Sequence, residues 1–356
     1  MSAGAEPVAT PVDAVPTTLD AVLAEAPGRL ARWMDSQALS SGPVEVSPIG
    51  GGTQNLLLRV RRGADRYVLR RCALLADDRE GTAMRRESQI LAALGATPVP
   101  HPRLVAFCGD TAVLGASFLL MEDVDGFCPR AGFPDRWAPA AVHRTGLALV
   151  NTLIELSRVD PCAAGWPGVR SGGWLERQVD RWRGQLDGYR GIDDYGGDRL
   201  PGVAEVGQWL DGHRPAAGRE GVVHGDYHLA NVIVRHGWPS VAAILDWELA
   251  SIGDPLLDLG HLLVTWPKGG LGPPELAALP LPGPDELIEH YRAGTGRSRA
   301  DIHWFTVLAG YRLAIILEGT HARARAGRAP AAVGQRLHTL AEVLVGNART
   351  AIADHG

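Results

Sequence analysis

Apolar and polar residues follow different patterns in the two parts of the chain on either side of residue 123. In the first part, short runs of apolar residues predict strands at residues 44–48, 55–61, 66–70, 104–108 and 118–121. Two helices are predicted there, at residues 18–39, where apolar residues recur at helical spacing, and at 81–94. Glycines at 50–52 and a turn at 62–65 separate the first three strands. Residues 18–123 are therefore expected to form a small α+β lobe.

The second part, residues 124–356, has a mainly helical pattern. Helices are predicted at residues 140–157, 174–189, 203–211, 254–264, 284–293 and 301–326. Short apolar runs at 221–223, 231–234 and 241–246 predict strands on either side of loops. Residues 268–284 are rich in Gly and Pro and predict a surface loop, and residues 1–17 predict a flexible tail.

The composition is that of an ordinary globular protein, with 46% hydrophobic residues, 21% charged residues and a net charge of −5. We expect no nucleic-acid partner, because no basic stripe is present. The N-terminus lacks the pattern of a signal peptide, and the longest apolar segment, 305–317, is interrupted by Arg312. The four cysteines do not have the spacing of a zinc site, and we expect them to be reduced thiols. We therefore expect a cytoplasmic protein with no membrane partner.

The most informative motif is His224-Gly225-Asp226-Tyr227-His228-Leu229-Ala230-Asn231, followed after twelve residues by Ile244-Leu245-Asp246-Trp247-Glu248. Phosphoryl transfer to a hydroxyl requires a carboxylate that orients the acceptor and takes its proton. It also requires oxygen ligands that hold Mg²⁺ against the triphosphate. An Asp, an Asn five residues later and a second Asp after the next strand can supply these groups.

This pair of motifs resembles the aminoglycoside phosphotransferase family, relatives of the protein kinases, in which H-R-D-x-x-x-x-N precedes D-F-G. The resemblance implies a bilobal protein-kinase-like fold, with a small sheet-rich N-lobe and a larger, mainly helical C-lobe. It implies that Asp226 is the catalytic base or the carboxylate that orients the acceptor, and that Asn231 and Asp246 bind Mg²⁺. It implies that Glu248 either binds a second metal ion or contacts the metal ligands from outside. The nucleotide implied is ATP, with GTP as an alternative.

The N-lobe is then expected to hold the phosphates. Gly51, Gly52 and Thr53 lie between two predicted strands, where glycines let backbone N–H groups approach phosphate oxygens. Kinases place a lysine at the end of the following strand, but the only lysine in this chain is Lys268. Arg70 therefore takes that place, with Arg71 as the alternative, and an arginine can bridge two phosphates. The helix glutamate that pairs with it is predicted to be Glu87.

Two further segments are assigned by the same resemblance. Phe118–Gly126 is similar to the hinge between the lobes, with Met121 as the gatekeeper and the backbone of Glu122 and Val124 as adenine partners. Asp258 lies in the first turn of a predicted helix and is expected to brace the loop that carries Asp226.

The acceptor is indicated by residues 177–182 and 311–319, which are similar to the kinase-like domain associated with acyl-CoA dehydrogenases. That resemblance implies a hydroxyacyl-CoA as the small-molecule hydroxyl acceptor. Residues 124–223 hold 13 Asp/Glu and 12 Arg, a balance that disfavours a polycationic acceptor. The alternatives are an antibiotic O-phosphotransferase of macrolide or aminoglycoside type, and a pseudokinase that binds nucleotide without chemistry.

Overall fold

The computed structural model describes residues 19–50, 55–72, 78–168, 172–196, 200–218 and 220–354. The predicted phosphate-binding residues Gly51, Gly52 and Thr53 lie outside these ranges. The chain divides into two compact units. The first holds the chain up to Ser88 and Arg103–Asp123, and the second holds Gln89–Pro102 and the chain from Val124 onward.

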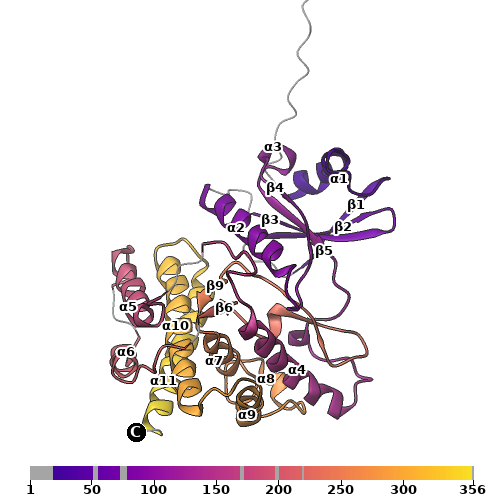
Figure 1. Ribbon diagram of the computed structural model, residues 1–356. Coiled ribbons are helices and arrows are strands. Elements are labelled where there is room, and N and C mark those ends of the chain that lie inside the picture. The colour runs from indigo at the N-terminus through magenta and orange to yellow at the C-terminus, as the bar shows by residue number, and fades with distance from the viewer. Residues whose placement is uncertain are drawn as a thin grey trace, which may run out of the picture. The chain divides into compact units, whose positions relative to one another are not determined.

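The first unit is built on an antiparallel sheet that has five strands among the described residues, in the order β1-β2-β3-β5-β4 (Figure 1). The strands are β1 (Val44–Pro48), β2 (Leu56–Arg62), β3 (Asp65–Arg71), β4 (Leu104–Cys108) and β5 (Phe118–Glu122). The helices are α1 (Leu19–Ser36), α2 (Asp78–Leu94), whose last turns fall in the second unit, and the short α3 (Thr111–Leu114).

The two faces of this sheet carry different side chains, because successive residues of a strand point to opposite sides. Helix α1 covers one face, where its Leu30 and Met34 pack against Leu58, Leu69 and their neighbours. Burial of each such side chain contributes about 1.5–3 kcal/mol to the free energy of unfolding. The cross-strand pairs Val68–Met121 and Arg70–Leu119 belong to the opposite face.

The second unit is mainly helical, with two short antiparallel strand pairs among its described residues. Its helices are α4 (Pro139–Arg158), α5 (Gln178–Gly188), α6 (Val203–Gly212), α7 (Leu256–Val264), α8 (Pro274–Ala277), α9 (Pro284–Thr295), α10 (Arg299–Arg325) and α11 (Ala331–Ala353). Strand β6 (Gly221–Val223) pairs with β9 (Ser251–Gly253), and β7 (Val232–Val234) pairs with β8 (Val241–Ile244). Four 3-10 turns complete the described elements: η1 (Pro129–Ala131), η2 (Leu175–Arg177), η3 (Tyr189–Gly191) and η4 (Leu229–Asn231).

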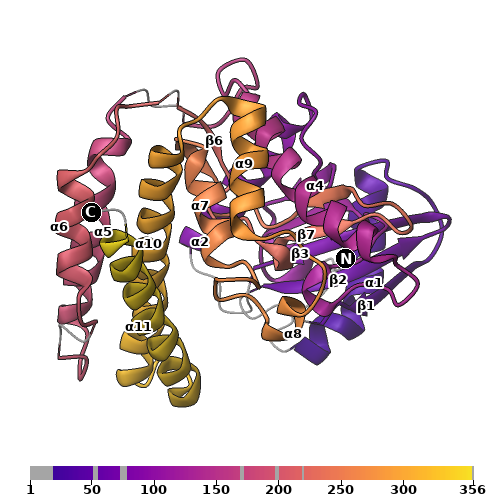
Figure 2. The same cartoon turned by 90° about the horizontal axis from the view of Figure 1, so that it is seen from below.

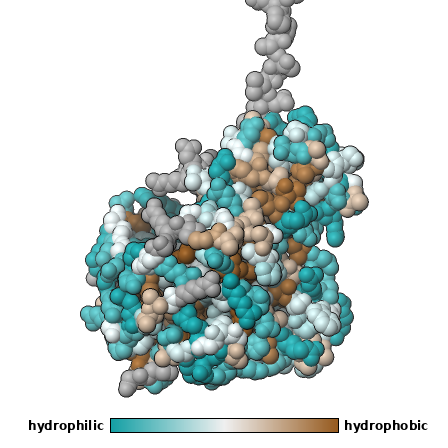
Figure 3. Space-filling view, in the orientation of Figure 1, coloured by the Kyte–Doolittle hydropathy of each residue, from teal (hydrophilic) through white to brown (hydrophobic). Residues whose placement is uncertain are grey.

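Helix α10 is the central helix of the second unit. It packs against α7 and α11 and also contacts α5 and α6, as the two ribbon views show (Figures 1 and 2). By length and composition α10 could cross a membrane, and among the described residues no other helix passes that test. Its most apolar window is 61% buried inside the protein, so packing in the core accounts for its apolar character. The surface seen in Figure 3 is mainly hydrophilic.

Three helices of the second unit differ from the prediction. Helix α8 lies within residues 268–284, which were predicted to be a surface loop, and its Leu276 is buried. The segment predicted as one helix over 174–189 is divided into η2, α5 and η3. Helix α11 was not predicted at all. Its buried positions include Gly334, Ala341 and Ala348 besides Leu344 and Val345, so its contact face is made largely of small residues. A face of Gly and Ala gives little hydrophobic periodicity in the sequence, although it allows a close approach to α10.

Candidate active site

Two loops of the second unit meet at the strand pair β7–β8. The first loop, residues 224–228, leaves β6 and passes through η4 into β7, and the second follows β8. The backbone N–H of Leu245 donates to the carbonyl of Asn231 at 2.8 Å, which extends the ladder by one step beyond the Val232–Ile244 pair. This bond places Asp246 just beyond the end of the first loop.

Asp226 and Asn231 are in direct contact. The Asn231 amide Nδ2 donates to the backbone carbonyl of Asp226 at 3.0 Å and to its carboxylate Oδ2 at 2.9 Å. The five-residue spacing therefore closes a compact turn in which the amide orients the carboxylate. Because Nδ2 makes these two bonds, Oδ1 of Asn231 is the atom that the amide can offer to a cation.

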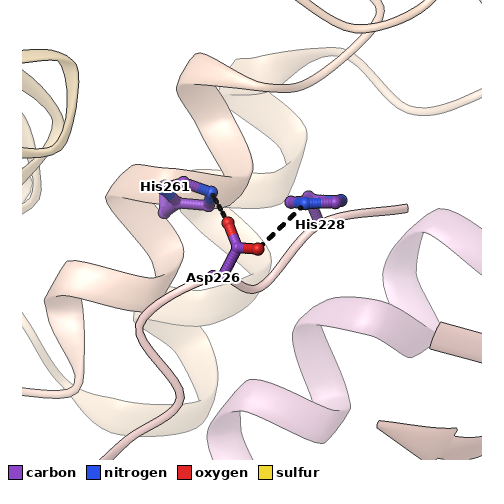
Figure 4. A group of neighbouring side chains, drawn as sticks. All are labelled: Asp226, His228 and His261. Atoms are coloured by element: carbon purple, nitrogen blue, oxygen red, sulfur yellow. Dashed lines mark ion pairs between the residues drawn. The ribbon is translucent and has the colours of Figure 1, made fainter. Parts of the chain in front are cut away.

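Two histidines flank the Asp226 carboxylate (Figure 4). Nε2 of His228 lies 3.4 Å from Oδ2, and Nε2 of the buried His261 lies 3.0 Å from Oδ1. Nδ1 of His228 accepts the backbone N–H of Ala230 at 3.1 Å, so its proton is on Nε2, facing the carboxylate. The His261 contact has the distance of an ion pair, but the carboxylate lies off the ring N–H direction, so its effect is mainly electrostatic.

These contacts keep Asp226 ionised. Burial raises the pKa of the Asp226 carboxyl, but the contacts with His228 and His261 outweigh burial and hold the pKa well below its ordinary value. Burial lowers the pKa of His261, which favours a neutral imidazole. A carboxylate held in this state is ionised at neutral pH and can accept a hydrogen bond from a hydroxyl, which it thereby orients.

His224 connects the two loops from inside. Its Nε2 donates to the carbonyl of Leu245 at 2.9 Å, and its Nδ1 accepts the backbone N–H of Asp226 at 3.2 Å. Burial lowers the pKa of His224 to about 4, so the ring is neutral and can act as donor and acceptor at once. Trp247 packs edge-on against this imidazole with ring centroids 4.7 Å apart. Both residues therefore have positioning roles behind Asp226.

Asp258 holds the backbone of the same loop, as the resemblance to the kinases implied. The N–H groups of His224 and Gly225 donate to its two carboxylate oxygens at 2.7 and 2.8 Å. Gly225 has a φ of +88°, and a Cβ there would lie 2.7 Å from the backbone oxygen of Leu249, so this position requires glycine. The buried guanidinium of Arg312 adds a positive charge that acts on Asp258 and Asp226.

Asp258 should give the stability a distinctive pH dependence. Burial raises the pKa of its carboxyl to about 6 from an ordinary 3.8, although the two backbone N–H groups and Arg312 oppose the rise. At pH values between these two pKa values, the Asp258 carboxyl takes up a proton when the protein folds. The contribution of Asp258 to the free energy of unfolding therefore falls as the pH rises through this range. The fall is up to about 1.4 kcal/mol per pH unit, or about 3 kcal/mol in all.

Chemical denaturation of the wild type and Asp258→Asn between pH 4 and 7 measures this contribution. The difference in unfolding free energy, wild type minus variant, should decrease as pH rises. A difference that is constant with pH would show that Asp258 does not change its protonation on folding. His224 contributes to both proteins, so its effect cancels in the difference.

The residues predicted to bind metal offer the oxygen donors that suit Mg²⁺. Asp246 has a left-handed backbone with φ of +62°, a conformation in which Asp is among the few tolerated residues. Such backbone outliers are concentrated at functional sites. Its carboxylate and Oδ1 of Asn231 make a hard donor set that fits the ion. Glu248, two residues beyond Asp246, is exposed.

In the first unit, the structure distinguishes the two arginines predicted to replace the kinase lysine. Arg70 is on the same face of the sheet as Met121 and forms a buried ion pair with Glu87. The Asn55 amide, with its oxygen turned toward Arg70, accepts from Nε at 3.2 Å and from a terminal nitrogen at 2.8 Å. Arg71 points to the face covered by α1 and donates to the carbonyls of Leu114 and Cys72 at 2.7 and 2.9 Å.

Substitution should separate the two roles. Arg71→Met leaves two buried carbonyls without their donor, so we expect a loss of about 1–3 kcal/mol in unfolding free energy with an unchanged nucleotide affinity. Arg70→Lys keeps a cation beside Glu87 but removes the fork of N–H donors, so we expect nucleotide binding to weaken about tenfold. Thermal denaturation and nucleotide titration of both variants measure this. The reverse pattern would assign the phosphate role to Arg71.

The predicted hinge residues follow β5. Met121 is buried within the strand and Glu122 ends it, exposed, with its N–H donating to the carbonyl of Arg103 at 3.0 Å. The backbone group of Glu122 that can bond to an adenine ring is therefore its carbonyl. Val124 is the first residue of the second unit after this boundary.

Sequence reasoning gave no role to His228, His261 or Arg312. His228 is inside the motif and could have been noted for its spacing. His261 is three residues after Asp258 in α7, so the two side chains share one helix face and reach the same loop. An Arg in the apolar run 305–317 was a further signal, because a buried cation requires carboxylate neighbours.

The second unit also has a mainly apolar cavity of about 250 Å³ among α7, α9, α10 and α11. Leu263, Val307 and Leu344 are among the residues that line it, and Asp226, Asn231 and Asp246 are not. This cavity is therefore separate from the carboxylate cluster.

Known proteins are similar to this chain in sequence and in fold. Mouse acyl-CoA dehydrogenase family member 10 is 28% identical over 85% of this chain, which spans only 29% of that relative's length. A candidate aminoglycoside phosphotransferase from Ralstonia eutropha is 27% identical, with a TM-score of 0.74 over 91% of this chain and 98% of its own. An aminoglycoside 2'-phosphotransferase-IIIa in complex with GDP has 18% identity and a TM-score of 0.60, over 89% and 97% of the two chains.

These comparisons confirm the predicted kinase-like α+β fold. The model of the phosphotransferase enzyme family matches residues 45–300, a range that includes Asp226, Asn231 and Asp246. Because this match covers well over half of the sequence, the chain belongs to the phosphotransferase enzyme family.

Proposed function

We propose that this protein transfers the γ-phosphoryl group of Mg-ATP to a hydroxyl group of a small molecule. The observation that carries the proposal is the arrangement around Asp226. Its carboxylate is oriented by Asn231, kept ionised by His228 and His261, and fixed to a loop that Asp258 and His224 hold from behind. Such an arrangement suits a group that must accept a proton at one defined position.

In the proposed reaction, Asp226 orients the acceptor hydroxyl and takes its proton. The hydroxyl oxygen forms the new bond to the γ-phosphorus while the bond from this phosphorus to the oxygen it shares with the β-phosphate breaks, and ADP leaves. Asn231 and Asp246 would hold Mg²⁺, which when bound offsets the negative charge of the triphosphate. Asp226 then returns its proton to solvent, and the site is ready for another cycle.

The nucleotide would be bound in part by the first unit. Arg70, oriented by Glu87 and Asn55, carries a planar fork of N–H donors that suits bidentate contact with phosphates. We assign it the place that a lysine has in kinases. The buried Glu87 compensates its charge, so the guanidinium is held in one orientation before nucleotide binds.

For the acceptor we propose a hydroxyacyl-CoA as the first compound to test. The similarity to a protein that bears the name acyl-CoA dehydrogenase family member supports this choice, as does the charge balance of residues 124–223. The arginines of α5 do not form a ready phosphate site. Arg183 is paired with Asp180 and Asp211 at 2.8 and 2.7 Å, and Arg181 stacks on Trp182.

Calorimetric titration with ATP and with GTP, each with and without Mg²⁺, tests the nucleotide. A coupled measurement of ADP release then compares hydroxyacyl-CoAs with macrolides and aminoglycosides. Release that depends on a hydroxyacyl-CoA and on Mg²⁺ supports the proposal, whereas release with an antibiotic alone would make the chain an antibiotic O-phosphotransferase. Nucleotide binding without transfer to any acceptor would favour the pseudokinase alternative.

A further inference from the structure

A second group of metal-binding side chains lies between α10 and α11 and shares no residue with the candidate active site. It consists of Glu318 and His321 of α10 and His338 of α11, which we call the helix-pair cluster. Glu318 and His321 are three residues apart and so lie on one helix face. Glu318 is fully buried, His321 is 4% exposed, and 13% of the His338 side chain is accessible.

Close packing of the two helices brings these side chains together. A Cβ on Gly334 would lie 2.3 Å from the Cβ of Ala324 and 3.4 Å from the Cα of His321, so α11 approaches α10 at this point as only glycine allows. One turn further along α11, the ring of His338 stacks on that of His321, with centroids 4.4 Å apart and planes inclined by 22°. The approach of the backbones therefore sets the spacing of the imidazoles.

The surrounding groups orient the possible ligand atoms. Nδ1 of His338 is 2.7 Å from Oε2 of Glu318, and the hydroxyl of Tyr195 donates to the other oxygen, Oε1, at 2.8 Å. Nε2 of His338 faces Glu342, whose Oε1 is 3.7 Å away. In metal sites, a ligating histidine commonly turns its second nitrogen to a carboxylate, and a ligating carboxylate is itself hydrogen-bonded. The cluster has both features.

We propose that Glu318, His321 and His338 bind a divalent transition-metal ion with the ligand preferences of Zn²⁺. Two imidazole nitrogens and one carboxylate oxygen are a ligand set for such an ion rather than for Mg²⁺ or Ca²⁺, which prefer oxygen. One donor atom from each residue lies within 4.8 Å of the others. Tetrahedral zinc separates its ligands by about 3.3 Å, given bonds of about 2.0–2.1 Å. An imidazole nitrogen binds a metal in the plane of its ring, so one of the two stacked rings must turn out of the stack for both planes to contain the ion.

The bound ion would attach α11 to the centre of the second unit. It would take the position between His338 and Glu318 and be reached from the side of Glu342, whose side chain is 45% exposed. Its positive charge would offset Glu318, which is buried with two stacked imidazoles beside it. Because the metal binds the folded state alone, it should raise the melting temperature.

The test uses the full chain after treatment with a chelator, with Zn²⁺ as the titrant and Co²⁺ as the spectroscopic probe. The cluster variant is His338→Gln. The matched control is His261→Gln, because Asp226, His228 and His261 also form a group able to hold a metal. We expect the wild type and His261→Gln to bind one Zn²⁺ tightly, with visible Co²⁺ bands of tetrahedral type and a raised melting temperature.

In His338→Gln we expect this binding to weaken by at least about 100-fold, and in Tyr195→Phe by about tenfold, because outer partners of metal ligands tune affinity by about 10–100-fold. Equal affinity in the wild type and His338→Gln, loss in His261→Gln alone, or no binding to the wild type would each overturn the proposal. Anomalous scattering from wild-type crystals grown with Co²⁺ locates the ion without any variant. An ion bound elsewhere would contradict the assignment.

Discussion

Asp226→Asn should reduce the rate of phosphoryl transfer by about 10³-fold while nucleotide affinity stays within about twofold of the wild type. The amide has nearly the shape of the carboxylate and can still contact Asn231, but it cannot accept the proton of the hydroxyl. General-base catalysis contributes typically about 10²–10⁴-fold, which sets the expected scale. Single-turnover transfer and calorimetric titration of nucleotide measure the two quantities separately.

The control for this variant is Asp193→Asn, which neutralises a carboxylate of the same unit whose side chain is 87% exposed. It should behave as the wild type in both measurements. Turnover that survives in Asp226→Asn would remove Asp226 from the role of base. If nucleotide binding is lost together with turnover, the negative charge of Asp226 instead acts in binding the metal ion or in positioning the phosphates.

Asp246→Asn should remove the dependence of nucleotide binding on Mg²⁺. We expect Mg-ATP to bind about 100-fold more weakly than to the wild type, because a charged ligand of the cation contributes several kcal/mol. Asparagine is the suitable substitution because it tolerates the left-handed backbone of Asp246, whereas alanine would add strain. The substitution thus removes the negative charge at position 246 and leaves the backbone conformation there unchanged.

Titration with ATP at several Mg²⁺ concentrations measures this effect. For the wild type, affinity should rise with Mg²⁺, and for Asp246→Asn it should be nearly constant. Glu248→Gln is measured beside it, since this exposed carboxylate is two residues away and is the further metal group that the resemblance implies. If the Glu248 variant loses the Mg²⁺ dependence and the Asp246 variant keeps it, the metal roles of the two residues must be exchanged.

The loop residues could be predicted because their chemistry depends on local sequence. Asp226 and Asn231 are five residues apart, and the structure joins them through the Asn231 amide. The contact of Asp258 with the loop was also predicted, but from the resemblance to the kinases, since Asp258 lies 33 residues after Gly225. For Asp226 and Asn231, the geometry of one short turn decides which atoms meet.

Other parts of the site depend on packing between distant segments and could not be predicted. His261 reaches Asp226 only because α7 is placed against the loop, and Arg312 reaches Asp258 only because α10 passes behind it. Strand periodicity predicts that Arg70 and Arg71 face opposite ways, but which face α1 covers follows from the fold. Helix α11 was missed because its packing face is made of small residues.

The arginine at position 70 has a consequence for chemical labelling. Reagents that acylate the lysine of a kinase nucleotide site have no amine to attack beside Glu87, since the guanidinium of Arg70 stays protonated and is a poor nucleophile. The single lysine, Lys268, donates to the carbonyl of Leu281 at 2.6 Å and is partly buried. Amine-directed probes would therefore not label the proposed nucleotide site, and a lysine introduced at an exposed position would be labelled besides the N-terminal amine and Lys268.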